Sequence, residues 1–142
     1  MTVTYTIADS KDDLIDVLRL RVEIFVMEQN GPHDEEPDVH DKESAFVVAK
    51  ADGTIIGTAR FRNVGDTVKI ERIAVKKEYR GRGIGRRLVD YAIEHIEREG
   101  PKVIFLHAQT AAEDFYQKLG FHPVGDRFVE AGIEHIKMVR EV

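Results

Sequence analysis

The residues with the clearest chemical potential form a short stretch rich in glycine and arginine, Arg80-Gly81-Arg82-Gly83-Ile84-Gly85-Arg86. A run typical of a strand precedes it, and a run typical of a helix follows it. Glycines at such a junction let main-chain N–H groups approach an anion without interference from Cβ atoms, and the amino terminus of a helix adds positive potential. Six of the 21 basic residues lie within the twelve positions 76–87, namely Lys76, Lys77, Arg80, Arg82, Arg86 and Arg87. The stretch therefore predicts a site for a pyrophosphate.

Two common phosphate motifs do not match this stretch. A P-loop needs GxxxxGK followed by Ser or Thr, and the chain contains no such run. The dinucleotide fingerprint GxGxxG fails because Arg86 or Leu88 occupies the third glycine position. Neither ATP nor NAD is favoured. A plain turn seldom needs three alternating glycines flanked by four arginines, so we favour a phosphate site over a structural connection.

Nucleophiles for covalent catalysis are scarce in this chain. It has no cysteine, its only serines are Ser10 and Ser44, and it has no Gly-x-Ser-x-Gly elbow. A cysteine nucleophile, a disulfide framework and a serine hydrolase are therefore excluded. Catalysis has to use oxygen or nitrogen groups, and direct attack by a substrate is favoured over a covalent enzyme intermediate.

Hydrophobic periodicity indicates the elements that position these residues. Alternation predicts a strand over 3–7, and Ser10 followed by apolar residues at helical spacing predicts a helix. Asp52-Gly53 predicts a hairpin turn between two strands. The remaining expected elements are strands over 45–49, 54–61, 67–75, 102–108, 121–124 and 133–139, and helices from 84 to about 99 and over 111–119. The order β-α-βββ-α-β-α-ββ predicts an α/β or α+β sheet with helices on its faces.

Composition bounds the class of protein. With 142 residues, 42% of them hydrophobic, we expect one domain over 1–142. The 21 basic and 26 acidic residues give a net charge of -5, which argues against general affinity for nucleic acid or an anionic membrane. The first residues lack the basic start and apolar run of a secretory signal, and no apolar stretch is long enough to cross a bilayer. We expect a cytoplasmic protein.

Two motifs in the second half of the chain have a familiar spacing. The first is Arg80-x-x-Gly83-x-Gly85 after a strand, and the second is Ala112-x-x-Phe115-Tyr116-x-x-Leu119-Gly120-Phe121. Together they resemble the GNAT superfamily of acyl-CoA-dependent N-acetyltransferases, and the segments LRVEIFVMEQ, AQTAAEDFY and EAGIEHIKM further resemble its ElaA-like branch. The resemblance spans nearly the whole chain. It implies a mixed, mainly antiparallel central sheet with helices on both faces, and it is compatible with a homodimer.

The resemblance also implies acetyl-CoA as the cosubstrate. Its pantetheine arm is expected against the strand that ends Ile73-Ala74-Val75, where an N–H near Ile73 polarises the thioester carbonyl. Gln109 stands where many family members carry asparagine, and we expect it to contact the cosubstrate. The pyrophosphate is expected on Arg80, Gly81, Arg82, Gly83, Ile84, Gly85 and Arg86.

Two side chains are candidates for proton transfer. Tyr116 matches the tyrosine that protonates the CoA sulfur in many family members, although a phenol with a pKa of about 10 is a weaker acid than a thiol at about 8.5. Glu71 lies in the strand that leads to Val75 and can remove a proton from an amine if it faces the same side as Ile73. Three alternatives stay open: Tyr116 as a core residue, Glu71 in a cross-strand ion pair, and His107 as the base.

The side chains that we expect to bind the acceptor come from the first helix and the central strand. Arg21 and Glu28 are seven positions apart, so on a continuous helix they share a face and bracket an amine or carboxylate, or they form a plain polar face. His107 is the third candidate. The acidic residues of 34–43 attract a cationic acceptor or are simply solvated. We expect no metal, because no ligand motif matches His33, Asp34, His40 and Asp41.

We therefore expect a single-domain N-acetyltransferase that moves an acetyl group from acetyl-CoA to a primary amine by direct attack in a ternary complex. Small amines, amino acids, aminoglycosides and protein lysines all fit as acceptors. One alternative is a non-catalytic acyl-CoA-binding module that regulates a protein partner. Another is a nucleic-acid-binding loop built on the same arginines, which net acidity and the lack of stacking aromatics apart from Tyr79 disfavour.

Overall fold

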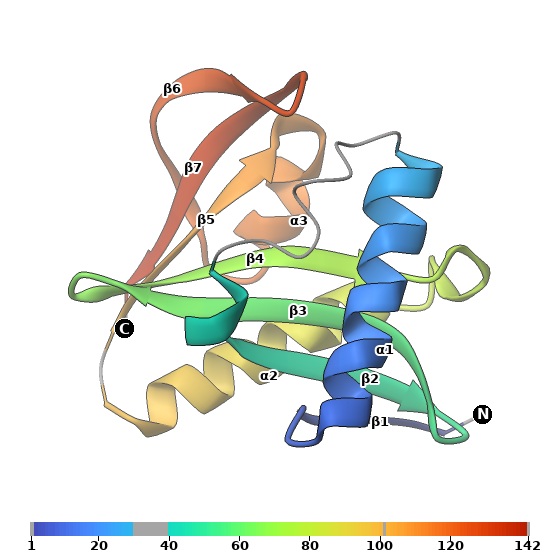
Figure 1. Ribbon diagram of the computed structural model, residues 1–142. Helices are drawn as coiled ribbons and strands as arrows, with labels where there is room; N and C mark the ends of the chain where they lie inside the picture. Colours follow the sequence, from blue (N-terminus) through green and yellow to red (C-terminus); the bar gives the residue numbers. More distant parts are fainter. Residues whose placement is uncertain (1, 30–39, 101, 142) are drawn as a thin grey trace.

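The computed structural model describes residues 2–29, 40–100 and 102–141. They form one seven-stranded sheet with the strand order β1-β2-β3-β4-β5-β7-β6 (Figure 1). Neighbouring strands are antiparallel except β4 and β5, which are parallel. The strands are β1 (Val3–Ile7), β2 (Ala45–Ala51), β3 (Thr54–Val64), β4 (Thr67–Val75), β5 (Val103–Gln109), β6 (His122–Glu130) and β7 (Ile133–Glu141).

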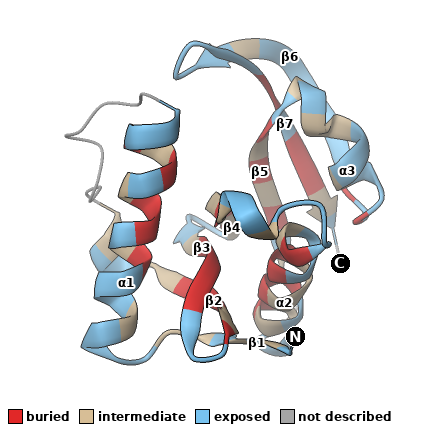
Figure 2. Cartoon of the chain, turned by 90° about the vertical axis from the view of Figure 1, so that its right-hand side faces the viewer, coloured by how far each residue is buried: buried red, intermediate tan, exposed pale blue. Residues whose placement is uncertain are grey.

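Helices cover both faces of this sheet, α1 on one side and α2 on the other (Figures 1 and 2). The element order and the mixed, mainly antiparallel sheet predicted from the sequence are confirmed. Within the described ranges, no helix has both the length and the apolar character needed to cross a membrane. The helices are α1 (Lys11–Arg21), which continues as a π-helical segment (Val22–Glu28), α2 (Ile84–Arg98) and α3 (Glu113–Gln117), with 3-10 turns over Asp41–Glu43, Lys77–Tyr79 and Thr110–Ala112.

Local signals in the sequence explain where α1 begins and why α3 is short. Ser10 caps α1, because its Oγ accepts a hydrogen bond from Asp13 N at 3.1 Å. The helix predicted over 111–119 is shorter in the structure, where a 3-10 turn over 110–112 precedes the five residues of α3. At its end Leu119 N donates to Tyr116 O at 3.0 Å, an i→i+3 bond that tightens the last turn.

The last hairpin is longer than the sequence predicts. β6 runs on to Glu130 instead of ending near 124, because it pairs with β7 on both sides of a bulge between Val124 and Phe128. β6 is the edge strand of the sheet, and nearly all of it is exposed. An edge strand buries few apolar side chains, so hydrophobic alternation marks it weakly.

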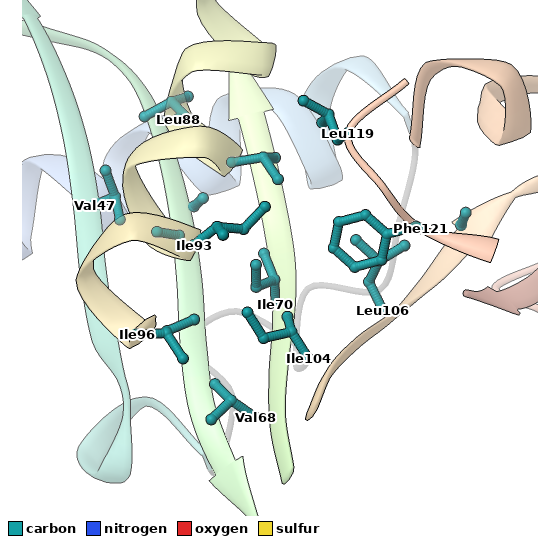
Figure 3. Close-up of a cluster of buried hydrophobic side chains, with 14 of the residues drawn as sticks. Val47, Val68, Ile70, Leu88, Ile93, Ile96, Ile104, Leu106, Leu119 and Phe121 are labelled. Carbon is teal, nitrogen blue, oxygen red and sulfur yellow. The ribbon is translucent and has the colours of Figure 1, made fainter. Parts of the chain in front are cut away.

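Apolar packing fixes α2 against the sheet. Gly57 on β3 permits the close approach, since a Cβ there would lie 3.1 Å from Leu88 Cδ1 and 3.3 Å from Ala74 O. A dense core of this kind resists shifts, so the loop that leads into α2 is held relative to β4. The cluster on the α2 face includes Val47, Val68, Ile70, Leu88, Ile93, Ile96 and Ile104 (Figure 3). A smaller cluster on the α1 face joins Val17, Leu20 and Ile24 to Phe46, Val48, Ile55 and Ala74.

β4 and β5 pair only at their starts and then diverge (Figure 1). Their parallel register joins 67–69 to 103–105. Further along, the pairing of β4 with β3 shifts between Thr58 and Arg60, and Arg72 has a φ of 53°, which is uncommon for a residue with a side chain. In the described residues, no strand pairs with the β5-side edge of β4 beyond Lys69.

Candidate active site

The glycine-rich stretch forms the turn between β4 and α2. Gly81 and Gly83 both have a φ of 79°, a left-handed conformation that glycine adopts without steric cost. Gly83 is the N-cap residue of α2, and no side chain caps this helix. A Cβ at either glycine would have no neighbouring atom within 4 Å, so both positions face open space.

The amino end of α2 therefore presents main-chain donors. Arg87 N donates to Gly83 O at 3.1 Å, which closes the first turn of the helix. The N–H groups of Ile84, Gly85 and Arg86 precede this bond and have no acceptor within the helix. These donors and the positive end of the helix dipole favour an anion, so this turn is the candidate anion receptor.

Individual arginines around this turn have different neighbours. The guanidinium of Arg82 lies over the Tyr79 ring, 5.3 Å from its centroid, and that of Arg87 lies over the Tyr5 ring at the same distance. These two side chains are thus held by aromatic faces at the start of α2. Arg86 is exposed, and its Nε lies 3.9 Å from Asp90 Oδ2 on the next turn of the helix.

Arg80 binds Glu28, which the sequence assigns to the acceptor site. Both Nη groups of Arg80 contact the Glu28 carboxylate, with 2.9 Å between Nη2 and Oε2, and Arg80 Nε donates to Val75 O at 2.9 Å. The hydrogen bond from Arg80 is the main cause that lowers the pKa of Glu28. The predicted pairing of Arg21 with Glu28 on one face is wrong, because the chain winds as a π-helix after Arg21.

Arg21 is buried in an ion-pair network instead of facing a substrate. Its side chain is 0% exposed, and its Nη1 and Nη2 donate to Asp41 Oδ1 and Oδ2 at 2.8 and 3.3 Å. Asp41 Oδ1 also accepts from Arg60 Nη1 at 2.9 Å. Arg60 in turn reaches Glu71. We call these residues, with Arg62 and Lys69, the charge network.

A cavity of about 570 Å³ opens between the diverging strands and the segment that follows α1. Phe25 and Gln29 contribute to it from that segment. Neither Arg21 nor Glu28 is among the described residues that line it. Five residues predicted for the site do line it, namely Glu71, Ile73, His107, Gln109 and Tyr116.

Glu71 is held as an ion by three cations. Its Oε2 accepts hydrogen bonds from Arg62 Nε at 2.7 Å and from Arg60, and its Oε1 lies 3.2 Å from Lys69 Nζ. Burial alone would raise the pKa of Glu71, but the hydrogen bond from Arg62 and the charges of Arg60 and Lys69 outweigh it and lower the pKa to about 2. So weak a base is poorly suited to deprotonate an amine. The structure contains the cross-strand ion pair, which favours that alternative over Glu71 as the base.

Tyr116 lies on α3, and its position fits both of its predicted roles, a packed core residue and a hydrogen-bond donor at the site. Its ring packs edge-on against Phe115 and Phe121, with centroids 5.0 and 6.0 Å away, and it also lines the cavity. Burial raises the pKa of Tyr116 to about 12. The phenol therefore stays protonated at neutral pH and can donate a hydrogen bond into the cavity.

Sequence reasoning missed the carboxylate beside His107. His107 Nδ1 lies 3.2 Å from Glu130 Oε1, and Glu130 Oε2 lies 3.7 Å from His135 Nε2. All three side chains line the cavity. A predicted strand that ends near 124 leaves Glu130 unplaced. Phe128 and Glu130 are two positions apart, so a strand extended to 130 would have put both on one face.

Most of the acidic residues between 33 and 43 lie outside the described residues, as do His33 and Asp34. Of those described, Asp41 belongs to the charge network, and Glu43 lies 2.7 Å from His40 Nδ1. In the part of the chain that the structure describes, no three His, Asp or Glu side chains gather in a way that could hold a metal ion.

Sequence comparisons agree with the family that the two motifs resemble. A family model described as an acetyltransferase (GNAT) domain matches residues 10–142. The uncharacterized N-acetyltransferase YjcF of Bacillus subtilis is 36% identical over 137 residues, which cover 95% of this chain and 97% of that protein. Protein ElaA of Escherichia coli is 33% identical over 138 residues, which cover 94% of this chain and 90% of ElaA.

Solved structures match over the same length. The crystal structure of Escherichia coli ElaA has a TM-score of 0.89 at 29% identity and covers 99% of this chain and 100% of its own. The PaiA N-acetyltransferase of Thermoplasma acidophilum, solved in complex with coenzyme A, shares the fold with a TM-score of 0.75 at 17% identity over all of both chains. The resemblance to the ElaA-like branch is confirmed, and this chain belongs to the GNAT acetyltransferase family.

Proposed function

We propose that this chain transfers an acetyl group from acetyl-CoA to a primary amine, which attacks the thioester directly in a ternary complex. One juxtaposition carries the proposal. The main-chain donors at the amino end of α2 follow β4 after the turn of residues 76–83. The β5-side edge of β4 has no strand partner beyond Lys69 among the described residues and borders the cavity. The candidate anion receptor, the open strand edge and the cavity follow one another. They suit a long cosubstrate that has a diphosphate, then amides, and then a reactive end.

Acetyl-CoA fits this arrangement in two parts. Its pyrophosphate is placed on the N–H groups of 81–86, where the open space beside Gly83 leaves room for phosphate oxygens. Its pantetheine amides are placed on the main chain of 73–75, which they meet as an added strand would. The coenzyme A complex of a protein with the same fold supports this choice of ligand.

The reactive end then lies in the cavity beside Ile73, Gln109 and Tyr116. The N–H of Ile73 polarises the thioester carbonyl, the amine nitrogen bonds to the carbonyl carbon, and the C–S bond breaks to release CoA thiolate. Because the pKa of Tyr116 is raised to about 12, far above the thiol value of about 8.5, Tyr116 stabilises the thiolate by donating a hydrogen bond and keeps its proton.

Calorimetry and a thiol-release assay across a panel of amines test the proposal. We expect saturable heat with acetyl-CoA, and thiol release that depends on an added primary amine. Binding without thiol release on any amine would identify the non-catalytic acyl-CoA-binding module. No heat at millimolar coenzyme A would contradict the site itself.

The order of events has its own kinetic signature. Direct attack requires both substrates on the protein at once, so double-reciprocal plots at several acetyl-CoA concentrations should intersect. Parallel lines would indicate a covalent acetyl-enzyme, which the lack of cysteine disfavours.

A further inference from the structure

The mechanism above leaves one group in the cavity unused, a carboxylate shared by two histidines. Glu130 of β6 contacts His107 of β5 at 3.2 Å and His135 of β7 at 3.7 Å. The ring of Phe128 packs edge-on against His107 and is stacked on His135, with centroids 5.0 and 5.9 Å away. The three polar side chains come from adjacent strands, and the register of β7 with β5 and β6 holds them together.

These contacts fix where the protons lie on both rings. An ionised carboxylate can only accept, so His107 Nδ1 donates to Glu130 and leaves Nε2 of the neutral ring unprotonated. His135 Nδ1 lies 2.7 Å from Ile133 O and donates to that carbonyl. The side chain of His135 is 9% exposed and that of His107 is 26% exposed. His107 is therefore the ring that a substrate in the cavity can reach.

Resting on the function proposed above, we infer that His107 is the base that deprotonates the acceptor and that Glu130 is the positioning residue that sets its ring and tautomer. As the amine nitrogen bonds to the acetyl carbon, its proton passes to His107 Nε2, and the electron pair of the C–S bond leaves with sulfur. Glu130 stays ionised and stabilises the imidazolium. The imidazolium then returns its proton to solvent or to the thiolate, which restores the neutral ring.

The charges around His107 support this role for Glu130. Among the described residues, Glu130 is the carboxylate within hydrogen-bond distance of His107, whereas Glu71 is bound to its own three cations. Lys137 pairs with His107 across β5 and β7, and its Nζ lies over the Phe105 ring at 4.8 Å. The other titratable or charged groups that face the cavity are His40, Arg60, Arg62, Lys69, Arg72, Tyr116 and His135.

NMR of the whole chain with ¹⁵N-labelled histidine tests the geometry without any acceptor. In the wild type near pH 8 we expect the His107 ring to be protonated on Nδ1. Glu130→Ala removes the acceptor of that proton and should move His107 toward the Nε2-protonated form. His122→Gln, which changes an exposed histidine at the start of β6, should leave the His107 signals in place. An Nε2-protonated His107 in the wild type would overturn the inference.

Steady-state kinetics with acetyl-CoA and the most active alkylamine of the panel tests the role. His107→Gln should lower kcat about 100-fold or more, leave acetyl-CoA binding unchanged by calorimetry, and recover in part with added imidazole. Glu130→Ala should lower kcat about 10-fold, because the His107 ring loses the carboxylate that sets its orientation and tautomer. His122→Gln is the matched control and should keep the wild-type kcat.

The outcomes separate this inference from the proposed function. Wild-type kcat in His107→Gln overturns the inference and leaves acetyl transfer standing. A low kcat that imidazole does not restore, in a variant with wild-type melting temperature and acetyl-CoA affinity, also overturns it, because the ring then acts through structure. A chain that acetylates no amine of the panel overturns the proposed function and this inference together.

Discussion

The amino end of α2 and the charge network beside the cavity handle charge in different ways. At the amino end of α2, left-handed glycines shape a turn beside open space, and the N–H groups of the first helical turn have no acceptor within the helix. The charge network instead gathers six side chains from α1, a 3-10 turn, β3 and β4, and buries most of their surface. The first arrangement is ready for an anion from outside, whereas carboxylates of the chain itself already occupy the second.

This difference shows which charged residues act on a ligand. In a receptor made of main-chain donors, the N–H groups of the first helical turn have no acceptor within the helix and are left for a ligand. In the charge network, Asp41 lies between two buried guanidinium groups, and Glu71 between three cations, so these carboxylates stabilise the fold. The following changes should affect ligand binding at one region and the free energy of unfolding at the other.

The largest effect is expected from Gly83→Glu, which puts a carboxylate into the anion receptor. Gly53 in the turn between β2 and β3 is a matched control, because it has the same φ of 79° and a Cβ there would also have no atom within 4 Å. Gly83→Glu should weaken acetyl-CoA binding about 100-fold or more, and Gly53→Glu should leave it unchanged, as measured by calorimetry. Equal affinities of the two variants would contradict the receptor at α2.

Glu71→Gln should mainly lower the stability of the fold, with a smaller effect on activity. The substitution keeps the shape of the side chain but leaves Arg60, Arg62 and Lys69 without its negative charge, which should lower the free energy of unfolding by about 3 kcal/mol. Urea denaturation measures this, with the exposed Glu94→Gln on α2 as control. Unchanged stability with a large loss of kcat would restore Glu71 as the base.

The pH dependence of stability provides a second test of Glu71. Its pKa is about 2 in the folded chain and near 4.5 in the unfolded chain, so the unfolded state binds more protons as the pH falls. The stabilisation is complete above about pH 4.5 and is lost as the pH approaches 2, in total roughly 2–3 kcal/mol. Between pH 5 and pH 2 the wild type should lose that much more stability than Glu71→Gln. Parallel curves would mean that Glu71 titrates normally.

The order of elements and the glycine turn that leads into α2 could be predicted because their signals are local. Ser10, Asp52-Gly53 and the glycines of 81–85 act within one turn of chain, and buried strands and α2 carry clear periodicity. The length of β6 could not be predicted in this way. Pairing with β7 extends it past a bulge, and its exposed residues show little alternation.

Side-chain roles were harder to predict because distant segments decide them. On a regular helix Arg21 and Glu28 share a face, but a π-helical segment separates them and gives each a partner elsewhere, Asp41 and Arg80. Glu71 has strand neighbours that the sequence reveals only once the register of β3 and β4 is known. Glu130 reaches His107 across β7, over 23 residues of sequence.

Tyr116→Phe should have a moderate effect confined to catalysis. The variant keeps the ring packing against Phe115 and Phe121 but loses the hydrogen bond proposed for the departing thiolate. We expect kcat to fall about 10-fold with acetyl-CoA affinity unchanged. Because the pKa of Tyr116 is raised to about 12, its ionisation should not limit wild-type kcat below pH 10. A wild-type kcat in Tyr116→Phe would limit this residue to packing.

The smallest effect is expected from Glu28→Gln, at the contact between the first helical segment and the anion receptor. Glu28 places a negative charge on Arg80, next to the proposed pyrophosphate site, and the pair is partly exposed, so water and salt weaken its influence. Removing the charge while keeping a polar group should strengthen acetyl-CoA binding about threefold at low salt and have no effect at high salt, as measured by calorimetry. Weaker binding in Glu28→Gln would mean instead that the ion pair holds Arg80 and the turn in place. The loss of that ion pair would then weaken acetyl-CoA binding more than the gain in positive potential strengthens it.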